Sequence, residues 1–327
     1  MREIKWGIIG TGSIASKFAR ALNSMKDTKL VGVASRNINK AKEFSEKFQV
    51  EKAYGSYEDL VKDEEIDVIY IGTPHTEHKA NAELCIKNGK AVLCEKPFTV
   101  NVADSEYLIS LAKDHKVFIM EAMWTKFLPV TIKVKQWIKD GRIGKVRHFR
   151  ISFGYSSPFD PNNRLYNPDL AGGALLDVGV YPITYVVHMM DCLPDKIISS
   201  AEFGQTQVDE QNIIIMKYKD GVLADLSSSV AIETGYDAVI IGEEGKLVVP
   251  KFWSAEEAYL YDSKNQLVEA YNEPHHENGY EYEAYEVNRC LRENMLESDK
   301  LPLKDTLDIM RIMDQIRSEW GLVYPQE

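Results

Sequence analysis

The first 120 residues alternate short apolar runs with longer stretches in which apolar positions recur every three or four residues. The runs KWGIIG, LVGVAS, IDVIYIGTP, KAVLCEKP and KVFIMEA have the character of strands. The amphipathic stretches between them predict helices, the first over residues 13–25. Strands that alternate with helices at this spacing form βαβ units around a parallel sheet. We therefore expect a doubly wound α/β Rossmann domain over residues 1–122.

From about residue 145 the pattern changes to strands that follow one another closely. They include VRHFRISFGY, KIISSAEFG, DAVIIG and KLVVP. A further strand-like stretch, QNIIIMKYKDGVLADLSSSV, contains the pair Asp220-Gly221, which is a strong hairpin signal. Strands joined by tight turns predict a large, mostly antiparallel, open sheet. Closing helices are expected at residues 280–296 and from Asp305 to Trp320. We expect this second α/β domain, which binds the substrate, to span residues 123–327.

One run in the second domain, Ile213–Met216, is apolar at every position. A strand of this kind is typically covered on both faces of its sheet. Helices can cover one face, and a second copy of the chain is the expected cover of the other. The sequence thus predicts a homodimer or higher homo-oligomer formed through the open sheet.

Composition narrows the classes of partner and compartment. The 327 residues have a formal net charge of −11, which disfavours binding to nucleic acids. No apolar run reaches the roughly 20 residues that a membrane-spanning helix needs, and no signal-peptide pattern precedes the first strand. The four cysteines are scattered and form no Cys-x-x-Cys pair, as in reduced proteins. We expect a cytoplasmic protein that binds neither membranes nor nucleic acids.

A glycine motif directly follows the first strand. Gly10 permits a tight turn, Gly12 lets the backbone approach a pyrophosphate, and Ala15 allows close packing of the helix on the strand. N–H groups at the start of that helix favour phosphate oxygens. Because the motif lies between a strand and a helix, it predicts a dinucleotide site that also includes Thr11, Ser13 and Ile14.

The end of the second strand indicates which dinucleotide is preferred. NAD sites usually carry an acidic residue there, which binds the ribose 2′-hydroxyl. This chain has Ser35 and Arg36 instead. A guanidinium can bind a 2′-phosphate through two hydrogen bonds, so the pair favours NADP over NAD. A solvated arginine, or one stacked on the adenine, is the alternative interpretation.

Two further stretches carry catalytic candidates. VLCEKPF ends a strand with Glu95 and Lys96, at the rim where α/β sheets bind ligands. GGALLDVGVY places Asp177 and Tyr181 four residues apart, on one face if the stretch is helical. Pro182 either kinks that helix or makes the segment an irregular lead-in turn. Taken locally, a core helix with a hydrogen-bonded tyrosine is the simpler interpretation.

The motifs occur together and in order. GIIGTGSIA, TPHTEH, EKPF, EAMWTKF and RLYNPDLAGGALLDVGVYP resemble the glucose–fructose oxidoreductase/inositol dehydrogenase/MocA family over essentially the whole chain. The Ser-Arg pair, EAMW and the tyrosine at position 181 are most similar to its NADP-dependent dihydrodiol dehydrogenase and D-xylose dehydrogenase branch. The resemblance implies a Rossmann domain followed by an α/β domain whose open sheet commonly forms dimers.

The resemblance also implies roles for individual residues. Lys96 is the EKP lysine near the nicotinamide, and Asp177 lies on the substrate helix. Tyr181 stands where many members have a catalytic histidine, which weakens the match to inositol dehydrogenases and strengthens the match to the tyrosine-using branch. The implied cofactor contacts also include Thr73, Pro74, His75 and Glu95, and the implied substrate contacts are Trp124, Phe153, Arg164 and, less securely matched, Trp253.

Proton transfer gives these residues a common chemistry. Oxidation of an alcohol needs a hydride acceptor and a group that takes the hydroxyl proton. Free tyrosine has a pKa of about 10, and a nearby lysine cation lowers it by stabilising the phenolate. We hypothesise that Tyr181 exchanges the proton while Lys96 tunes it and hydrogen-bonds the substrate oxygen. Asp177 then orients Lys96 or binds a substrate hydroxyl.

The sequence thus predicts an NADP-dependent oxidoreductase that transfers a hydride between the nicotinamide and a sugar or small vicinal diol. A reductase of a dicarbonyl sugar and a non-catalytic NADP-sensing regulator are the alternatives, and the presence of both Lys96 and Tyr181 favours an enzyme. No metal is expected, because no His, Asp and Glu cluster has ligand spacing. His275 and His276 are expected in an exposed loop, and whether they reach the cleft is left open.

Overall fold

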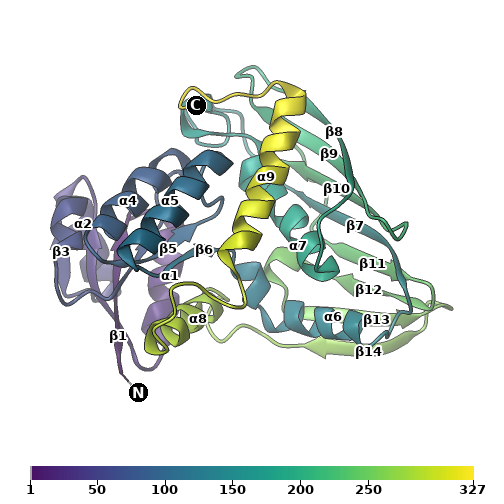
Figure 1. The fold of residues 1–327 in the computed structure, drawn as a ribbon, viewed down its shortest axis with the longest axis horizontal. Coiled ribbons are helices and arrows are strands. Elements are labelled where there is room, and N and C mark those ends of the chain that lie inside the picture. The colour runs from purple at the N-terminus through teal and green to yellow at the C-terminus, as the bar shows by residue number, and fades with distance from the viewer. Residues whose placement is uncertain (1) are drawn as a thin grey trace. The chain divides into compact units, whose positions relative to one another are not determined.

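The computed structural model describes residues 2–327, which form two compact units. Unit 1 comprises the chain up to Trp124 together with His276–Met310, and unit 2 comprises Thr125–His275 with Arg311–Glu327 (Figure 1). The division of the sequence into domains 1–122 and 123–327 stays a prediction. The units differ from it in the segment His276–Met310, which packs with unit 1.

Unit 1 contains a six-stranded parallel sheet in the order β3-β2-β1-β4-β5-β6. All of its strands except the edge strand β3 are largely buried on both faces, which accounts for their continuous apolar runs. This doubly wound Rossmann sheet confirms the predicted fold of the N-terminal part. The strands are β1 (Ile4–Ile9), β2 (Thr28–Ala34), β3 (Lys52–Tyr54), β4 (Val68–Ile71), β5 (Ala91–Glu95) and β6 (Ile119–Ala122).

Helices cover both faces of this sheet. One face packs against α3 (Tyr57–Val61), α4 (His78–Lys87) and α5 (Val102–His115). The other packs against α1 (Ser13–Ser24), α2 (Ile38–Phe48) and α8 (Glu281–Arg292). The Trp6 indole donates a hydrogen bond to Asn288 of α8, 3.0 Å away, which ties this late segment to the first strand.

Unit 2 is built on an eight-stranded sheet in the order β14-β13-β12-β11-β7-β10-β9-β8. β7 and β10 run parallel, and the other neighbouring strands run antiparallel, which confirms the predicted sheet. The predicted hairpin joins β9 to β10, with Gly221 at a φ of +80°. The strands are β7 (Val146–Gly154), β8 (Lys196–Phe203), β9 (Asp209–Lys217), β10 (Leu223–Ser229), β11 (Ala238–Gly242), β12 (Gly245–Val249), β13 (Glu257–Asp262) and β14 (Leu267–Asn272).

The two faces of this sheet differ. The helices α6 (Pro129–Lys139) and α7 (Val180–Met190) lie on one face (Figure 1), where Ile214 and Met216 are buried. On the opposite face Ile213 is 58% exposed and Ile215 is 40% exposed. The expectation that both faces of this strand are covered therefore holds for one face within the described chain. The last helix, α9, covers Leu303–Trp320.

The segment Pro168–Met190 is long and apolar enough to span a membrane by length and composition, contrary to the expectation from the sequence. Its 23 residues include a window with a mean hydropathy of 1.5, and 89% of that window is buried inside the protein. A segment that is apolar all round and enclosed by its own fold is typical of a core helix.

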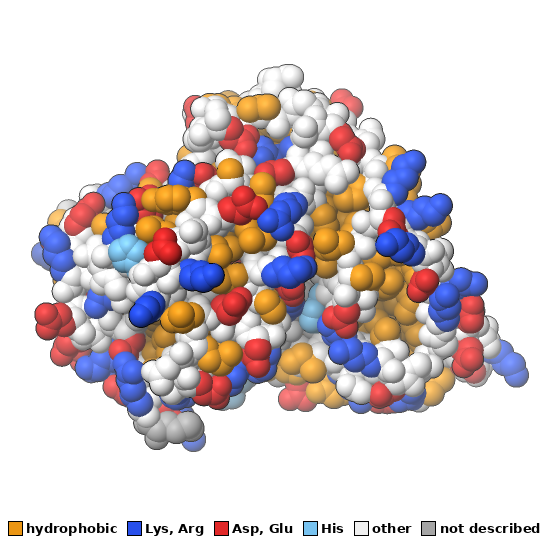
Figure 2. Space-filling model, in the orientation of Figure 1, with side chains coloured by type: hydrophobic (Ala, Val, Ile, Leu, Met, Phe, Trp, Pro, Cys, Tyr) orange, Lys and Arg blue, Asp and Glu red, His pale blue; other side chains and the backbone are white. Residues whose placement is uncertain are grey.

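Charged side chains of both signs are interspersed over the face shown in Figure 2, so that face carries no basic stripe suited to nucleic acid.

Candidate active site

The turn between β1 and α1 in unit 1 fits a diphosphate. Gly10 has a φ of +106°, and a Cβ there would lie 2.7 Å from the carbonyl oxygen of Gly72. A Cβ on Gly12 would meet nothing within 4 Å, so the space beside this residue is open. Gly12 is the N-cap of α1, which has no side-chain cap and no acidic residue in its first turn. The N–H groups of Ser13 and Ile14 and the helix dipole thus favour an anion at this point.

The end of β2 presents a cation to solvent. Ser35 is buried, and its hydroxyl accepts the backbone N–H of Asn37 at 3.3 Å. The Arg36 side chain is 72% exposed, and its Nη1 lies 3.9 Å from a carboxylate oxygen of Glu77. An exposed ion pair of this length contributes little stability, so the guanidinium can turn to a phosphate at small cost. Sequence reasoning missed Glu77 because the two residues are far apart along the chain.

The EKP segment follows β5. Lys96 is joined to Pro97 by a cis peptide bond. The buried Glu95 carboxylate accepts the hydroxyl of Tyr70 at 2.5 Å and the backbone N–H of Lys96 at 3.2 Å. The Tyr70 ring stacks on Phe18 of α1 with centroids 3.8 Å apart. Glu95 therefore anchors the segment to the interior of unit 1, and its predicted contact with the cofactor stays a prediction.

His78 joins the two loops that the sequence assigns to the cofactor. Its ring is fully buried, with Nδ1 2.9 Å from the carbonyl oxygen of Pro97 and Nε2 3.0 Å from that of Thr73. Burial lowers the pKa of His78, while the hydrogen bonds to the two carbonyl oxygens act in the opposite direction. Sequence reasoning assigned no role to His78. The neighbouring His75 is also buried, with its ring centroid 5.9 Å from that of His78.

Trp124 is the last residue of the first segment of unit 1. Its ring stacks on Tyr280, which immediately precedes α8, with centroids 4.2 Å apart and planes 7° from parallel. Tyr280 is buried. The stack fixes the orientation of Trp124, and its predicted substrate contact stays a prediction.

In unit 2, Asp177 lies in a π-helical turn, Leu175–Gly179, that continues directly into α7. Tyr181 and Pro182 are in the first turn of α7. Proline lacks an N–H and crowds the carbonyl four residues earlier, here that of Val178. A π-helical turn widens the backbone at such a point. The helix therefore continues through Pro182, and the irregularity expected there takes the form of this turn.

The buried Asp177 is the centre of a polar cluster. Its carboxylate accepts hydrogen bonds from Arg164 Nη1 at 2.7 Å and from the Tyr155 hydroxyl at 2.8 Å. Burial and the charge of Asp177 raise the pKa of Tyr155, so its hydroxyl stays protonated and donates. Burial lowers the pKa of Arg164, but attraction to Asp177 outweighs it. Sequence reasoning did not select Tyr155, and the predicted contact of Asp177 with Lys96 or a substrate hydroxyl stays a prediction.

Aromatic rings surround Tyr181. Its ring centroid lies 5.4 Å from that of Phe153 and 6.4 Å from that of Trp253. Phe153 stacks on Trp253 at 4.9 Å, and Arg164 interacts electrostatically with Tyr181 as well as with Asp177. The structure thus brings together the unit 2 residues that the sequence selected, including Trp253, whose match was least secure. Lys96 and Trp124 belong to unit 1.

The structure also describes His275 and His276, for which the sequence left open whether they reach the cleft. His275 is half-buried with Nε2 3.3 Å from the carbonyl oxygen of Ser254, the residue after Trp253, and His276 is exposed. Within residues 2–327 no group of three or more His, Cys, Asp and Glu side chains is arranged to hold a metal ion.

Comparisons with known proteins identify the family of this chain. Residues 4–123 match a family model described as an oxidoreductase family with an NAD-binding Rossmann fold, and residues 131–248 match the GFO/IDH/MocA C-terminal domain. The chain is 34% identical to the trans-1,2-dihydrobenzene-1,2-diol dehydrogenase of Mus musculus, over 99% of each chain. It is 33% identical to the human enzyme of the same name, again over 99% of each chain.

Solved structures show the same fold at lower identity. The 3-ketoreductase KijD10 from Actinomadura kijaniata, in complex with NADP and TDP-benzene, has a TM-score of 0.87 and 23% identity over 97% of this chain and 98% of that one. The aldose-aldose oxidoreductase from Caulobacter crescentus, complexed with glycerol, has a TM-score of 0.87 and 20% identity over 99% and 100%. The chain belongs to the GFO/IDH/MocA family of oxidoreductases and is an NAD(P)-dependent dehydrogenase.

Proposed function

We propose that this dehydrogenase uses NADP and transfers a hydride between the nicotinamide and a sugar or small vicinal diol. The observation that carries the proposal is the setting of Tyr181, which stands beside the Asp177–Arg164 pair and against the rings of Phe153 and Trp253. Aromatic rings beside a few charged groups suit the binding of a small polyol. The relatives named as dihydrobenzenediol dehydrogenases support a vicinal diol.

The residues of the chain divide the chemistry among them. The bound dinucleotide supplies the hydride acceptor. Tyr181 takes the hydroxyl proton in oxidation and returns it in reduction, and Lys96 stabilises its phenolate and binds the substrate oxygen. The Arg164 guanidinium, fixed by Asp177 and 49% exposed in its side chain, binds a further substrate hydroxyl. Trp124 adds an aromatic contact to the substrate.

Arg36 is proposed to select NADP. Replacing it with alanine removes charge-assisted hydrogen bonds to the 2′-phosphate, so NADPH should bind roughly 10- to 100-fold more weakly while NADH binding stays unchanged. Fluorescence titration with both nucleotides measures the two affinities. Arg20→Ala, which removes an exposed arginine of α1, is the matched control. Tighter binding of NADH than of NADPH by the unmodified protein would contradict the proposal.

We also propose that the open face of the eight-stranded sheet forms a homodimer or higher homo-oligomer. Replacing Ile213 with glutamate puts a charge into this apolar face and should convert the assembly to monomers in analytical ultracentrifugation. Ile132→Glu, on the exposed side of α6, is the control and should leave the assembly intact. A monomeric unmodified protein at micromolar concentration would overturn the proposal. The exposed apolar residues of this face are Ile198, Ile213, Ile215, Leu223 and Ile241.

The proposed compartment is the cytoplasm. All four cysteines are free, with Cys85, Cys94 and Cys290 buried and Cys192 exposed. Free thiols are usual in a reducing compartment.

A further inference from the structure

A buried carboxylate lies under the start of the turn that carries Asp177. Asp209, the first residue of β9, is 0% exposed. Its Oδ2 accepts the backbone N–H of Leu175 at 2.8 Å and the side-chain amide of Asn212 at 2.9 Å. Its Oδ1 has no hydrogen-bond partner within residues 2–327. Burying a carboxylate with one unsatisfied oxygen lowers the stability of the fold. Asp209 therefore contributes through the Leu175 N–H and the Asn212 amide that its Oδ2 holds in place.

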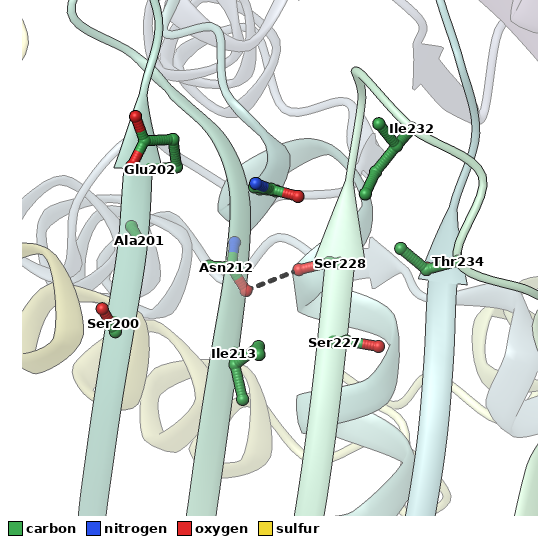
Figure 3. A pocket seen from close by; sticks show the side chains of 10 residues that line it. Ser200, Ala201, Glu202, Asn212, Ile213, Ser227, Ser228, Ile232 and Thr234 are labelled. Atoms are coloured by element: carbon green, nitrogen blue, oxygen red, sulfur yellow. Dashed lines mark hydrogen bonds between the residues drawn. The ribbon is translucent and has the colours of Figure 1, made fainter.

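The same network reaches both ends of the turn. A Cβ on Gly173, whose φ is +119°, would lie 2.2 Å from Oδ1 of Asp209. A Cβ on Gly179 would lie 2.9 Å from the Ser228 hydroxyl oxygen. Ser228 donates to the Asn212 amide oxygen at 2.7 Å across neighbouring strands, as Figure 3 shows. The two glycines let the backbone rest directly on these polar side chains.

We propose that Asp209, supported by Asn212 and Ser228, is a positioning residue that fixes the turn bearing Asp177 and thereby the helix bearing Tyr181. The path is short, because the N–H that Asp209 holds belongs to Leu175, the first residue of a turn that leads without interruption into α7. The inference rests on the proposed roles of Asp177 and Tyr181.

The surroundings of Asp209 make this positioning sensitive to pH. Burial raises the pKa of Asp209 to about 7, and the hydrogen bonds from Asn212 and Leu175 offset only part of that effect. The charged group that faces it is Arg317 of α9, which is 4% exposed and pairs with Asp314 and Glu327. The Tyr324 hydroxyl, whose pKa is raised by burial and then by Asp209, stays neutral.

The ionisation of Asp209 determines how kcat and the free energy of unfolding change with pH. Above about pH 7 the ionised carboxylate holds both N–H donors, and below it the neutral acid accepts them more weakly. We therefore expect kcat to fall as the pH drops through this range. Stability changes in the opposite direction. The folded protein keeps a proton that the unfolded chain has released, so the free energy of unfolding decreases as the pH rises from about 4 to about 7.

Two substitutions test the proposal. Asp209→Asn keeps one oxygen for both N–H donors, which already share Oδ2, but cannot ionise. It should keep kcat close to normal at pH 8 and lose the inflection near pH 7, and its unfolding in urea should lose the matching pH dependence. Asp209→Ala should lower kcat roughly 10- to 100-fold with the Kd for NADPH unchanged. Asp220→Asn, in the exposed turn after β9, is the control.

A parallel assay of Tyr181→Phe separates this inference from the proposed function. If Tyr181→Phe keeps full activity, the proposed function fails whatever the Asp209 variants do. If Tyr181→Phe is inactive but both Asp209 variants match the unmodified enzyme in kcat and pH profile, the positioning role is overturned. Should Asp209→Ala not fold, Asp209→Asn decides alone in the reduction direction, where ionisation of Tyr181 lowers the rate as the pH rises. A rise of kcat through pH 7 that persists in that variant rules out Asp209 as the titrating group.

Discussion

Replacing Tyr181 with phenylalanine should lower kcat about 10²- to 10⁴-fold, the usual loss when a general acid–base group is removed. The ring itself is retained, so its packing beside Phe153 and Trp253 is preserved. The Kd for NADPH should therefore stay unchanged. Steady-state kinetics in both directions, combined with a nucleotide titration, separates the loss of chemistry from any loss of binding.

Tyr185 provides a matched control for that experiment. It lies four residues further along α7 and is fully buried, and its hydroxyl has no hydrogen-bond partner within residues 2–327. Tyr185→Phe removes the same atom from the same helix and should leave kcat unchanged. A folded Tyr181→Phe enzyme with near-normal kcat would rule out proton transfer by Tyr181.

Replacing Lys96 with methionine should also lower kcat strongly, by roughly 10²- to 10³-fold, because it removes the cation that we propose favours the phenolate. The methionine side chain retains much of the apolar stem of the lysine, so the variant removes mainly the charge. In the oxidation direction the rate rises with pH as the tyrosine ionises. Without the lysine cation this rise should move to higher pH, toward the value of about 10 for free tyrosine. The pH profile of kcat measures the displacement.

The control for Lys96 is Lys87→Met, which removes an exposed lysine at the end of α4. It should change neither kcat nor the pH profile. A Lys96→Met enzyme with reduced kcat and an unshifted profile would show that the lysine acts on the substrate alone and does not tune Tyr181.

The parts of the molecule that sequence predicts well are those set by local pattern. The alternation of apolar runs and amphipathic stretches is enough for the Rossmann sheet, since its inner strands are buried on both faces. Gly10 and Gly12 are recognisable because the conformation and the open space that they provide depend on a few adjacent residues. The second sheet is recognisable from its tight turns, such as the one at Gly221.

The residues that sequence missed act across long separations. Tyr155 meets Asp177 22 residues away, His78 meets the Pro97 carbonyl 19 residues away, and Asp209 meets Leu175 34 residues away. No local periodicity encodes such pairs. The π-helical turn was foreseen only as an irregularity, because Pro182 excludes a regular bond without specifying what replaces it.

The apolar run Ile213–Met216 shows a different limit. Periodicity indicates that both faces of a strand are apolar, but it does not distinguish a covering helix from a second copy of the chain. Within the described chain Ile214 and Met216 are buried, while Ile213 and Ile215 remain exposed.

The proposed oxidation of a vicinal diol or sugar with NADP can be measured as the rate of NADPH formation with cyclic diols and aldoses, trans-1,2-dihydrobenzene-1,2-diol among them. We predict turnover of at least one of these compounds, faster with NADP than with NAD and lost in Tyr181→Phe. Tight binding of NADPH without turnover of any of them, or faster turnover with NAD, would contradict the account.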